Sequence, residues 1–130
     1  MKVLTIRQPW AWAIIFEGKD VENRSWNTLF RGNLAIHAAV TYKADAWLPR
    51  GVVPPPPEDL AFGAIIGVVT LADVVTSSRS RWFAGEYGFV LRDPRPLARP
   101  IKCKGRLGLW NPTTAQEKRI IFQLRSHTSR

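Results

Sequence analysis

Apolar and polar residues alternate at the start of the chain, which predicts a short strand over Lys2–Arg7. The segment that follows, Trp10–Glu17, is apolar at nearly every position, so we expect a helix that is buried on most of its surface. Pro9 suits the first turn of such a helix, where its missing N–H is not needed, and Gly18 suits its end. The chain is therefore expected to begin with a strand and a core helix.

Further strands are predicted where alternating or continuously apolar stretches end at glycine, proline or polar clusters. These stretches are Lys19–Arg24, Asn33–Ala38, Gly63–Val75, Tyr87–Arg92 and Leu97–Lys102. The third is the richest in valine and isoleucine, and Gly67 within it indicates a bulge or a close approach of another part of the chain. Prolines lie between the last two stretches, so we expect two separate strands there.

Two more helices are expected, a short one over Thr41–Leu48 and a longer one over Thr113–Leu124. Thr113 or Thr114 can cap the longer helix ahead of Glu117. The loops between the predicted elements are rich in glycine, proline and polar residues, which is typical of a compact fold with short strands.

Together these elements indicate an α+β fold. Five or six short strands, an early helix and a late helix suit a small, strongly curved sheet or barrel that is packed by helices. At 130 residues, the chain is expected to form one domain over 1–130. Pro54–Pro57 is expected to be an extended surface connection within that domain, because neither flank could build a core alone.

Composition excludes several kinds of site. The single cysteine, Cys103, rules out an intramolecular disulfide and a cysteine zinc cluster. The two histidines, His37 and His127, have no acidic cluster beside them, so no metal and no cofactor is expected. The apolar stretches are shorter than the ~20 residues of a membrane helix. We therefore expect a cytoplasmic protein without a membrane partner.

Positive charge is concentrated in the second half of the chain, which has a formal net charge of +9. Residues 1–65 hold seven Lys and Arg against six Asp and Glu, whereas residues 66–130 hold twelve against four. The excess is densest over Arg92–Arg106, where Asp93 is the one acid among six cations. Such a field attracts polyanions, so RNA or another nucleic acid is the expected partner. The alternative is a basic surface without a specific partner.

Three ordered stretches resemble a known family. They are Leu4–Ala11, then Gly18–Trp26 followed by Arg31–Ala38, and Gly63–Leu71 with Trp82 and Tyr87–Phe89 behind it. In this order and spacing, roughly residues 1–110 resemble the ASCH domain of the PUA-like superfamily. The resemblance implies a small β-barrel with the early helix over a cleft, and an association with RNA. Some relatives remove an acyl group from N4 of cytidine and others are described as ribonucleases, and a shared fold does not decide between these activities.

The densest polar cluster next to apolar sequence is Lys19, Glu22, Asn23 and Arg24. If this segment is extended, Glu22 and Arg24 share one face, while Lys19 and Asn23 share the other. A carboxylate, an amide and a guanidinium can together read the polar edge of a base. The alternative is a purely structural ion pair of Glu22 with Arg24 or Arg7.

The same cluster bears on catalysis. In the hydrolase relatives, a lysine after a glycine acts with a threonine three residues later and with a glutamate. Here Lys19 matches the lysine, Glu22 stands where the threonine would be, and Glu86 is the counterpart of the glutamate. A carboxylate is a poor substitute for the activated hydroxyl in acyl transfer, which needs a nucleophile beside a base. Glu22 could instead activate a water while Lys19 stabilises an oxyanion.

The six tryptophans divide into two groups. Trp10, Trp26 and Trp82 are candidates for a base-stacking slot, because stacking on an indole tolerates any base. Core packing is the alternative for Trp26 and Trp82, and it is the expectation for the other three. Those three are Trp12, Trp47 and Trp110.

The sequence therefore predicts a nucleic-acid-binding module that recognises a nucleotide or modified base in a cleft. A small amidohydrolase acting on N4-acylated cytidine, or a ribonuclease, is the alternative, and a free modified nucleoside is then the second possible partner. The expected nucleic-acid-binding residues are Arg7, Gln8, Trp10, Asn23, Arg24, Trp26, Trp82, Arg99, Lys102 and Lys104, and the candidate catalytic residues are Lys19, Glu22 and Glu86.

Overall fold

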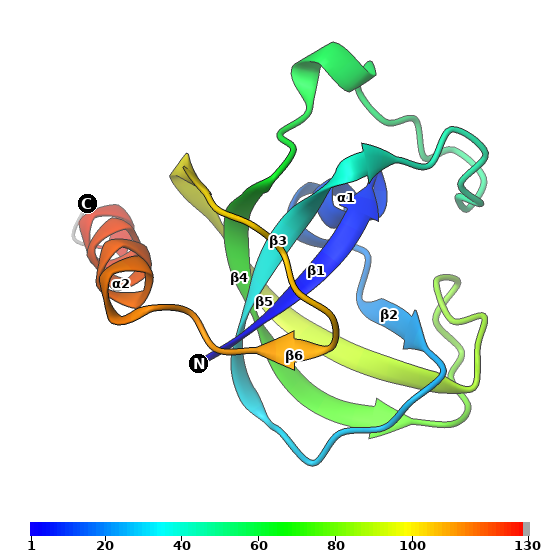
Figure 1. Cartoon of the computed structure of the whole chain (residues 1–130). Coiled ribbons are helices and arrows are strands. Elements are labelled where there is room, and N and C mark those ends of the chain that lie inside the picture. Colours follow the sequence, from blue (N-terminus) through cyan, green and yellow to red (C-terminus); the bar gives the residue numbers. More distant parts are fainter. Residues whose placement is uncertain (129–130) are drawn as a thin grey trace.

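The computed structural model describes the backbone of residues 1–128 and the side chains of residues 1–125. Within that range, six strands form one strongly curled sheet, and two α-helices and one short 3-10 helix accompany it (Figure 1). The elements in chain order are β1 (Lys2–Gln8), α1 (Trp10–Phe16), β2 (Val21–Arg24), β3 (Gly32–Tyr42), η1 (Pro57–Asp59), β4 (Ala64–Val75), β5 (Tyr87–Lys102), β6 (Leu109–Trp110) and α2 (Thr114–Thr128).

The strand order in the sheet is β2-β5-β4-β3-β1-β6. Strand β1 runs parallel to β3, and the other neighbouring strands are antiparallel. The register between β4 and β5 shifts at three places, and such bulges increase the local twist and bend of a sheet. The expected small, curved α+β sheet with an early and a late helix is therefore confirmed.

Gly67 lies beside a register shift in both of its strand pairings, as the sequence predicted. A Cβ atom there would lie 2.6 Å from Cδ1 of Ile15 and 2.9 Å from the carbonyl oxygen of Arg95. The missing side chain therefore lets α1 approach the concave face of the sheet closely.

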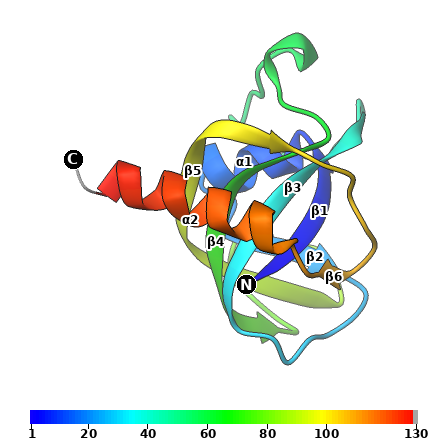
Figure 2. The same ribbon diagram turned by 60° about the vertical axis from the view of Figure 1, so that its left-hand side comes forward.

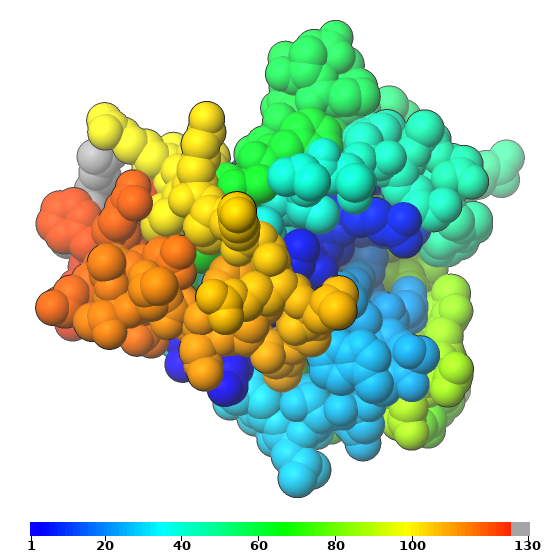
Figure 3. Space-filling view, viewed as in Figure 1, coloured from blue at the N-terminus to red at the C-terminus, as the bar shows by residue number. Residues whose placement is uncertain are grey.

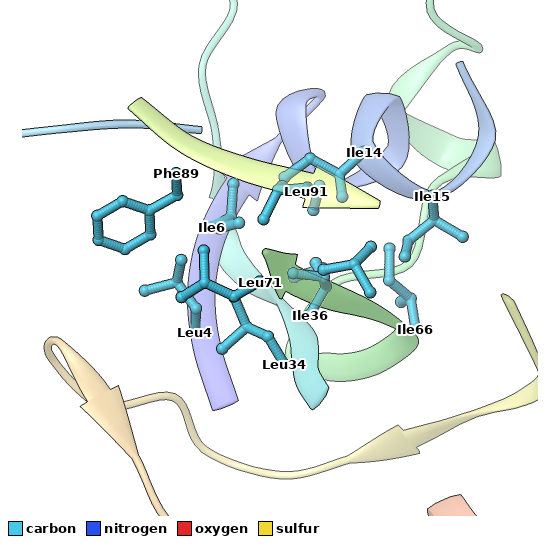
Figure 4. Packing of buried hydrophobic residues seen from close by; sticks show 13 residues of the cluster. Leu4, Ile6, Ile14, Ile15, Leu34, Ile36, Ile66, Leu71, Phe89 and Leu91 are labelled. Atoms are coloured by element: carbon cyan, nitrogen blue, oxygen red, sulfur yellow. The ribbon is translucent and has the colours of Figure 1, made fainter. Parts of the chain in front are cut away.

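Two layers of apolar side chains pack on opposite sides of the sheet. One layer lies between α1 and the inside of the curl, and Figure 4 shows Ile14 and Ile15 of the helix meeting residues of β1, β3, β4 and β5. The other lies under α2, where Ile120 is fully buried beside Ile101 of β5. A third cluster contains Ala13 and joins α1 to the loops before η1 and before β5. The prediction of a mostly buried early helix is confirmed.

The C-terminal helix begins as predicted. The backbone N–H of Gln116 donates to Oγ1 of Thr113 at 3.1 Å, and the N–H of Thr113 donates to Oε1 of Gln116 at 2.9 Å. This reciprocal pair is a capping box, and its second member is Gln116 rather than Glu117. The helix continues to Thr128, beyond the predicted end, and Figure 2 shows it crossing the outside of the sheet and extending past it.

Two other predictions were wrong. No helix forms over Thr41–Leu48: β3 continues to Tyr42, which pairs with Gln8, and a loop follows. The β-branched and aromatic residues at the end of β3 favour a strand, and a partner strand is available to them. The two strands expected on either side of the prolines are one strand, β5. Pro94 and Pro100 are exposed, Pro96 pairs beside a register shift, and Asp93 bends the strand with a φ of 54°.

Strand β6 was not predicted. It consists of two residues that pair with Val3 and Leu4 of β1, and two residues are too few to show any periodicity.

Candidate functional site

A cleft of about 560 Å³ opens beside the ends of β1 and β2. Its walls come from β1, from residues 19–26, from the loop after β3 and from the loop before β5. Figure 3 shows the hollow between the segment after β3, coloured teal, and the segment around β2, coloured light blue, with β1 at its floor. A cleft of this size is within the range of small-molecule sites, which is ~300–1,000 Å³.

Three charged side chains meet at the inner wall of the cleft. Nζ of Lys19 lies 2.8 Å from Oε1 of Glu22, and Nη2 of Arg24 lies 2.8 Å from Oε2. Lys19 also donates to the carbonyl oxygen of Val21, and Arg24 donates to that of Thr5 at 3.2 Å. Each oxygen of the Glu22 carboxylate therefore has its own cation.

The predicted placement of these residues was correct for one pair and wrong for Lys19. Glu22 and Arg24 lie on the same face of β2 and form the expected ion pair. Lys19 was expected on the opposite face, but β2 begins at Val21, so strand alternation does not extend to Lys19. Gly18, with a φ of 74°, turns the chain at the end of α1 and brings Lys19 toward the carboxylate.

The carboxylate of Glu22 is held in its charged form. Glu22 and Lys19 are only 7% and 3% exposed. Burial alone would raise the pKa of Glu22, but the nearby Lys19 and Arg24 together outweigh it and hold the pKa below its usual value. Such a carboxylate is a weak proton acceptor, which argues against Glu22 as a general base. Two cations and one anion leave the group with one net positive charge, and Arg7 adds another at the cleft.

Asn23 organises the loop before β5. Its Nδ2 donates to the carbonyl oxygen of Trp82 at 2.8 Å, and its Oδ1 accepts from the N–H of Ala84 at 2.9 Å. Trp82 is 3% exposed, packs in the third core cluster and is part of the cleft lining, with Nζ of Lys19 at 5.8 Å from its ring centre. Asn23 therefore holds part of the cleft wall in place.

Indole rings form much of the remaining lining. Of the tryptophans that the structure describes, four line the cleft: Trp10, Trp26, Trp47 and Trp82. The ring of Trp26 stands edge-on to Phe89, with centroids 5.2 Å apart. Nε1 of Trp10 donates to the carbonyl oxygen of Trp47 at 3.1 Å, which ties the loop after β3 to the start of α1.

The predicted roles of the other tryptophans were correct in part. Trp110 is buried and Trp12 packs against the third cluster, as expected of core residues. The prediction of a core position for Trp47 was wrong, because the residue is 58% exposed in a loop where a helix had been expected. The cleft also includes Thr5 and Ser25, which no sequence pattern had singled out.

Several other residues that were predicted as binding or catalytic residues lie outside the cleft. Gln8 is buried, and its amide is occupied by the carbonyl oxygen of Ala61 and the N–H of Trp12. Its predicted contact with nucleic acid stays a prediction. Glu86 is exposed and lines a shallower depression next to the cleft, together with Asn23 and Arg24. The exposed cations Arg99, Lys102 and Lys104 belong to the distal half of β5 and the loop after it.

No group of three or more His, Cys, Asp or Glu side chains that could hold a metal occurs among the described residues. His37 is buried and bonds through Nε2 to the carbonyl oxygen of Cys103 at 2.7 Å. The side chain of His127 lies outside the described residues. None of the described helices has the length and apolar character needed to span a bilayer.

Comparison with solved structures identifies the fold. ASCH from Zymomonas mobilis matches with a TM-score of 0.59 at 18% identity, over 93% of each chain. Two single-substitution variants of the same protein match with a TM-score of 0.57 at 20% identity. The chain therefore has the ASCH-type, PUA-like fold that the three sequence stretches indicated. No protein-family model matches it.

Among curated proteins, activating signal cointegrator 1 from Homo sapiens is 27% identical over 124 residues, and the Mus musculus protein is 27% identical over 128 residues. Each alignment covers 82% of this chain and 21% of the relative. The chain thus spans about a fifth of the length of these relatives.

Proposed function

We propose that the protein binds RNA by holding one nucleotide in the cleft, with the base against the indole rings and its polar edge toward Lys19, Glu22 and Arg24. The observation that carries this proposal is the combination of four tryptophans with a positively charged group at the inner wall of one cleft. The similarity to ASCH-type proteins supports the same class of ligand.

The aromatic walls suit a flat ligand. The segments that carry Trp26 and Trp47 lie on opposite sides of the hollow (Figure 3), so a base between them can contact both walls. Stacking of a base on an aromatic side chain contributes about 1–3 kcal/mol and does not depend on the identity of the base.

The polar wall offers both donors and acceptors to that base. Lys19 uses two of its N–H groups within the chain, and Arg24 uses Nε and Nη2. The remaining N–H group of Lys19 and the Nη1 group of Arg24 can donate to a carbonyl oxygen of a base. The free lone pairs of the Glu22 carboxylate can accept from an exocyclic amine.

The proposal is tested by measuring the affinity of single-stranded RNA for cleft variants at low salt. Trp26→Ala and Trp47→Ala should each weaken binding by about 5- to 100-fold through the loss of stacking. Trp47 is mostly exposed, so its removal leaves the core intact. Phe16→Ala removes an exposed aromatic residue of α1 outside the cleft, and it should bind like the wild type. Equal affinities for all four proteins would contradict the proposal.

Hydrolysis of an N4-acylated cytidine, or cleavage of RNA, is the second candidate, and the position of Lys19 in the cleft favours it. The low pKa of Glu22 weighs against a mechanism in which that carboxylate takes a proton. Incubation with N4-acetylcytidine, followed by chromatography for cytidine, tests the reaction. Lys19→Met keeps the length of the side chain without its charge, and turnover that survives this change would exclude Lys19 as a catalytic residue.

A further inference from the structure

The outer face of α2 presents an aromatic ring among cations. Phe122 is 71% exposed, and the exposed residues Lys118 and Arg119 precede it by four and three positions. Residues at these spacings are neighbours on a helix surface. Ile120 and Gln123, by contrast, face β5, where Ile120 is fully buried. Packing of the apolar side of α2 thus leaves Phe122 and the two cations toward solvent.

The loop between β5 and β6 passes beside Thr5, a residue of the cleft lining. The N–H of Arg106 donates to Oγ1 of Thr5 at 3.3 Å, and Thr5 is part of the cleft lining. A Cβ atom on Gly105 would lie 2.7 Å from that same oxygen, so only glycine allows the loop to lie this close to β1. Lys104 and Arg106 are both exposed on the loop. The backbone of the loop therefore lies against a residue of the cleft lining, and the loop carries two exposed cations.

On the surface of the molecule, the distal half of β5 links this loop to α2. Gln123 of the helix accepts from the N–H of Arg99 at 3.0 Å and donates to its carbonyl oxygen at 2.9 Å, which fixes the helix against the strand. Arg99 and Lys102 are exposed on β5. The sequence has no acidic residue from position 94 to position 116. In Figure 3 the yellow and orange segment after β5 borders the hollow, and α2 lies beyond it.

We infer that this surface is a second contact for single-stranded RNA, which extends the binding proposed for the cleft. We name this surface the β5–α2 path. It consists of the cations Arg99, Lys102, Lys104 and Arg106, and it ends at Lys118, Arg119 and Phe122. The path holds the phosphodiester backbone next to the cleft nucleotide, and Phe122 stacks with an unpaired base. The ligand is then an oligonucleotide rather than a free nucleoside.

The chemistry of the path favours RNA over an anionic membrane. A helix that lies on a membrane buries a wide apolar face in it. The apolar face of α2 is instead covered by β5, and its exposed large apolar residues in the described range are Ile121 and Phe122. An exposed aromatic ring between cations along a basic track is typical of surfaces that bind single-stranded nucleic acid.

The test compares a mononucleotide with a single-stranded RNA of roughly 12 nucleotides, which is within the span of one small-domain site. Fluorescence of the cleft tryptophans measures binding of the mononucleotide, and anisotropy of a labelled RNA measures binding of the longer ligand. Phe122→Ala should weaken binding of the longer ligand by about 5- to 100-fold and leave mononucleotide binding unchanged. Phe122→Trp should keep the affinity, whereas Phe122→Leu, which is apolar but cannot stack, should lose it.

Charge is tested separately with Lys118→Gln combined with Arg119→Gln. This double variant should bind the longer RNA more weakly and lower the slope of log affinity against log salt by about 1.4, or ~0.7 for each lost phosphate contact. Lys118→Arg combined with Arg119→Lys keeps both charges and should resemble the wild type.

The possible outcomes separate this inference from the proposal for the cleft. If the Phe122 and charge variants bind the longer RNA normally, the β5–α2 path is not a contact. The same holds if Phe122→Leu binds normally, or if α2 binds anionic vesicles in preference to RNA. If the wild type binds neither the mononucleotide nor the RNA, the cleft proposal and the inference both fail.

Discussion

At the scale of single residues, Glu22 is the side chain that holds the polar wall of the cleft together. Glu22→Gln would remove the one negative charge between Lys19 and Arg24, and leave a buried ammonium group without its counter-ion. We expect the free energy of unfolding to fall by about 3–5 kcal/mol, because breaking a buried pair leaves an uncompensated charge. Urea denaturation measures this change. Glu86→Gln, at an exposed site, should leave the stability within about 0.5 kcal/mol of the wild type.

His37 makes stability depend on pH. Burial lowers its pKa below the ordinary value of 6.5, and the hydrogen bond to Cys103 only partly offsets this effect. Between the lowered pKa and 6.5, the unfolded chain binds more protons, so the free energy of unfolding should decrease as the pH falls below 6.5. Denaturation curves across that range measure the slope.

His37→Gln keeps a donor for the carbonyl oxygen of Cys103 but does not titrate, so it should remove the decrease that starts at pH 6.5. The lowered pKa of Glu22 acts in a separate range: its contribution is complete above pH 4.5 and is lost in stronger acid. If the His37→Gln variant still loses stability between pH 6.5 and pH 4.5, His37 is not the cause of the decrease in that range.

Residue-scale predictions from the sequence succeeded where a local rule decides and failed where it does not. Strand alternation correctly placed Glu22 and Arg24 on one face. It failed for Lys19 because that residue precedes the strand, and it is the turn at Gly18 that brings the amine to the carboxylate. Trp47 could not be placed from its neighbours, since its exposure depends on a loop whose path is set by a hydrogen bond from Trp10.

At the scale of elements, the contact between α1 and β4 depends on Gly67. Gly67→Ala would place a methyl group within 3 Å of both the Ile15 side chain and the carbonyl oxygen of Arg95. We expect a loss of about 1–3 kcal/mol in the free energy of unfolding, as is usual for overpacking. Combining it with Ile15→Val should recover only part of the loss, because the Arg95 carbonyl cannot move aside like a side chain. Full recovery, or no loss from Gly67→Ala alone, would contradict this account.

The start of α2 gives a second test at this scale. Thr113→Ala removes the side-chain oxygen that accepts from Gln116, and it should cost about 1 kcal/mol. Thr114→Ala is the matched control, since Thr114 follows the cap inside the first helical turn, and it should change stability far less. Thermal unfolding of both variants measures the difference, and equal effects would show that Thr113 is not the cap.

Most elements were predictable because their apolar pattern is local, as in β1, α1, β4 and α2. The errors share a different cause. The helix expected over Thr41–Leu48 gave way to a longer β3, because a neighbouring strand was available for pairing. The prolines in β5 did not divide it, because their positions face solvent or a register shift. These outcomes depend on residues distant in sequence.

At the scale of the whole molecule, the curled sheet brings together four separate segments to build one cleft. The sequence predicted the fold type and the excess of positive charge. It could not predict which of the basic residues meet the tryptophans, since that depends on how the strands pair. Of the residues predicted to bind nucleic acid, six line the cleft, three lie on β5 or the loop after it, and Gln8 is buried with its amide hydrogen-bonded within the chain.

The most direct test of the central claim is a titration with single-stranded RNA, followed through the indole N–H resonances of the protein. If the cleft holds a base, the largest shifts should occur at Trp10, Trp26, Trp47 and Trp82, with Trp12 changing least. Binding that leaves the four cleft resonances unmoved, or shifts Trp12 most, would contradict the account.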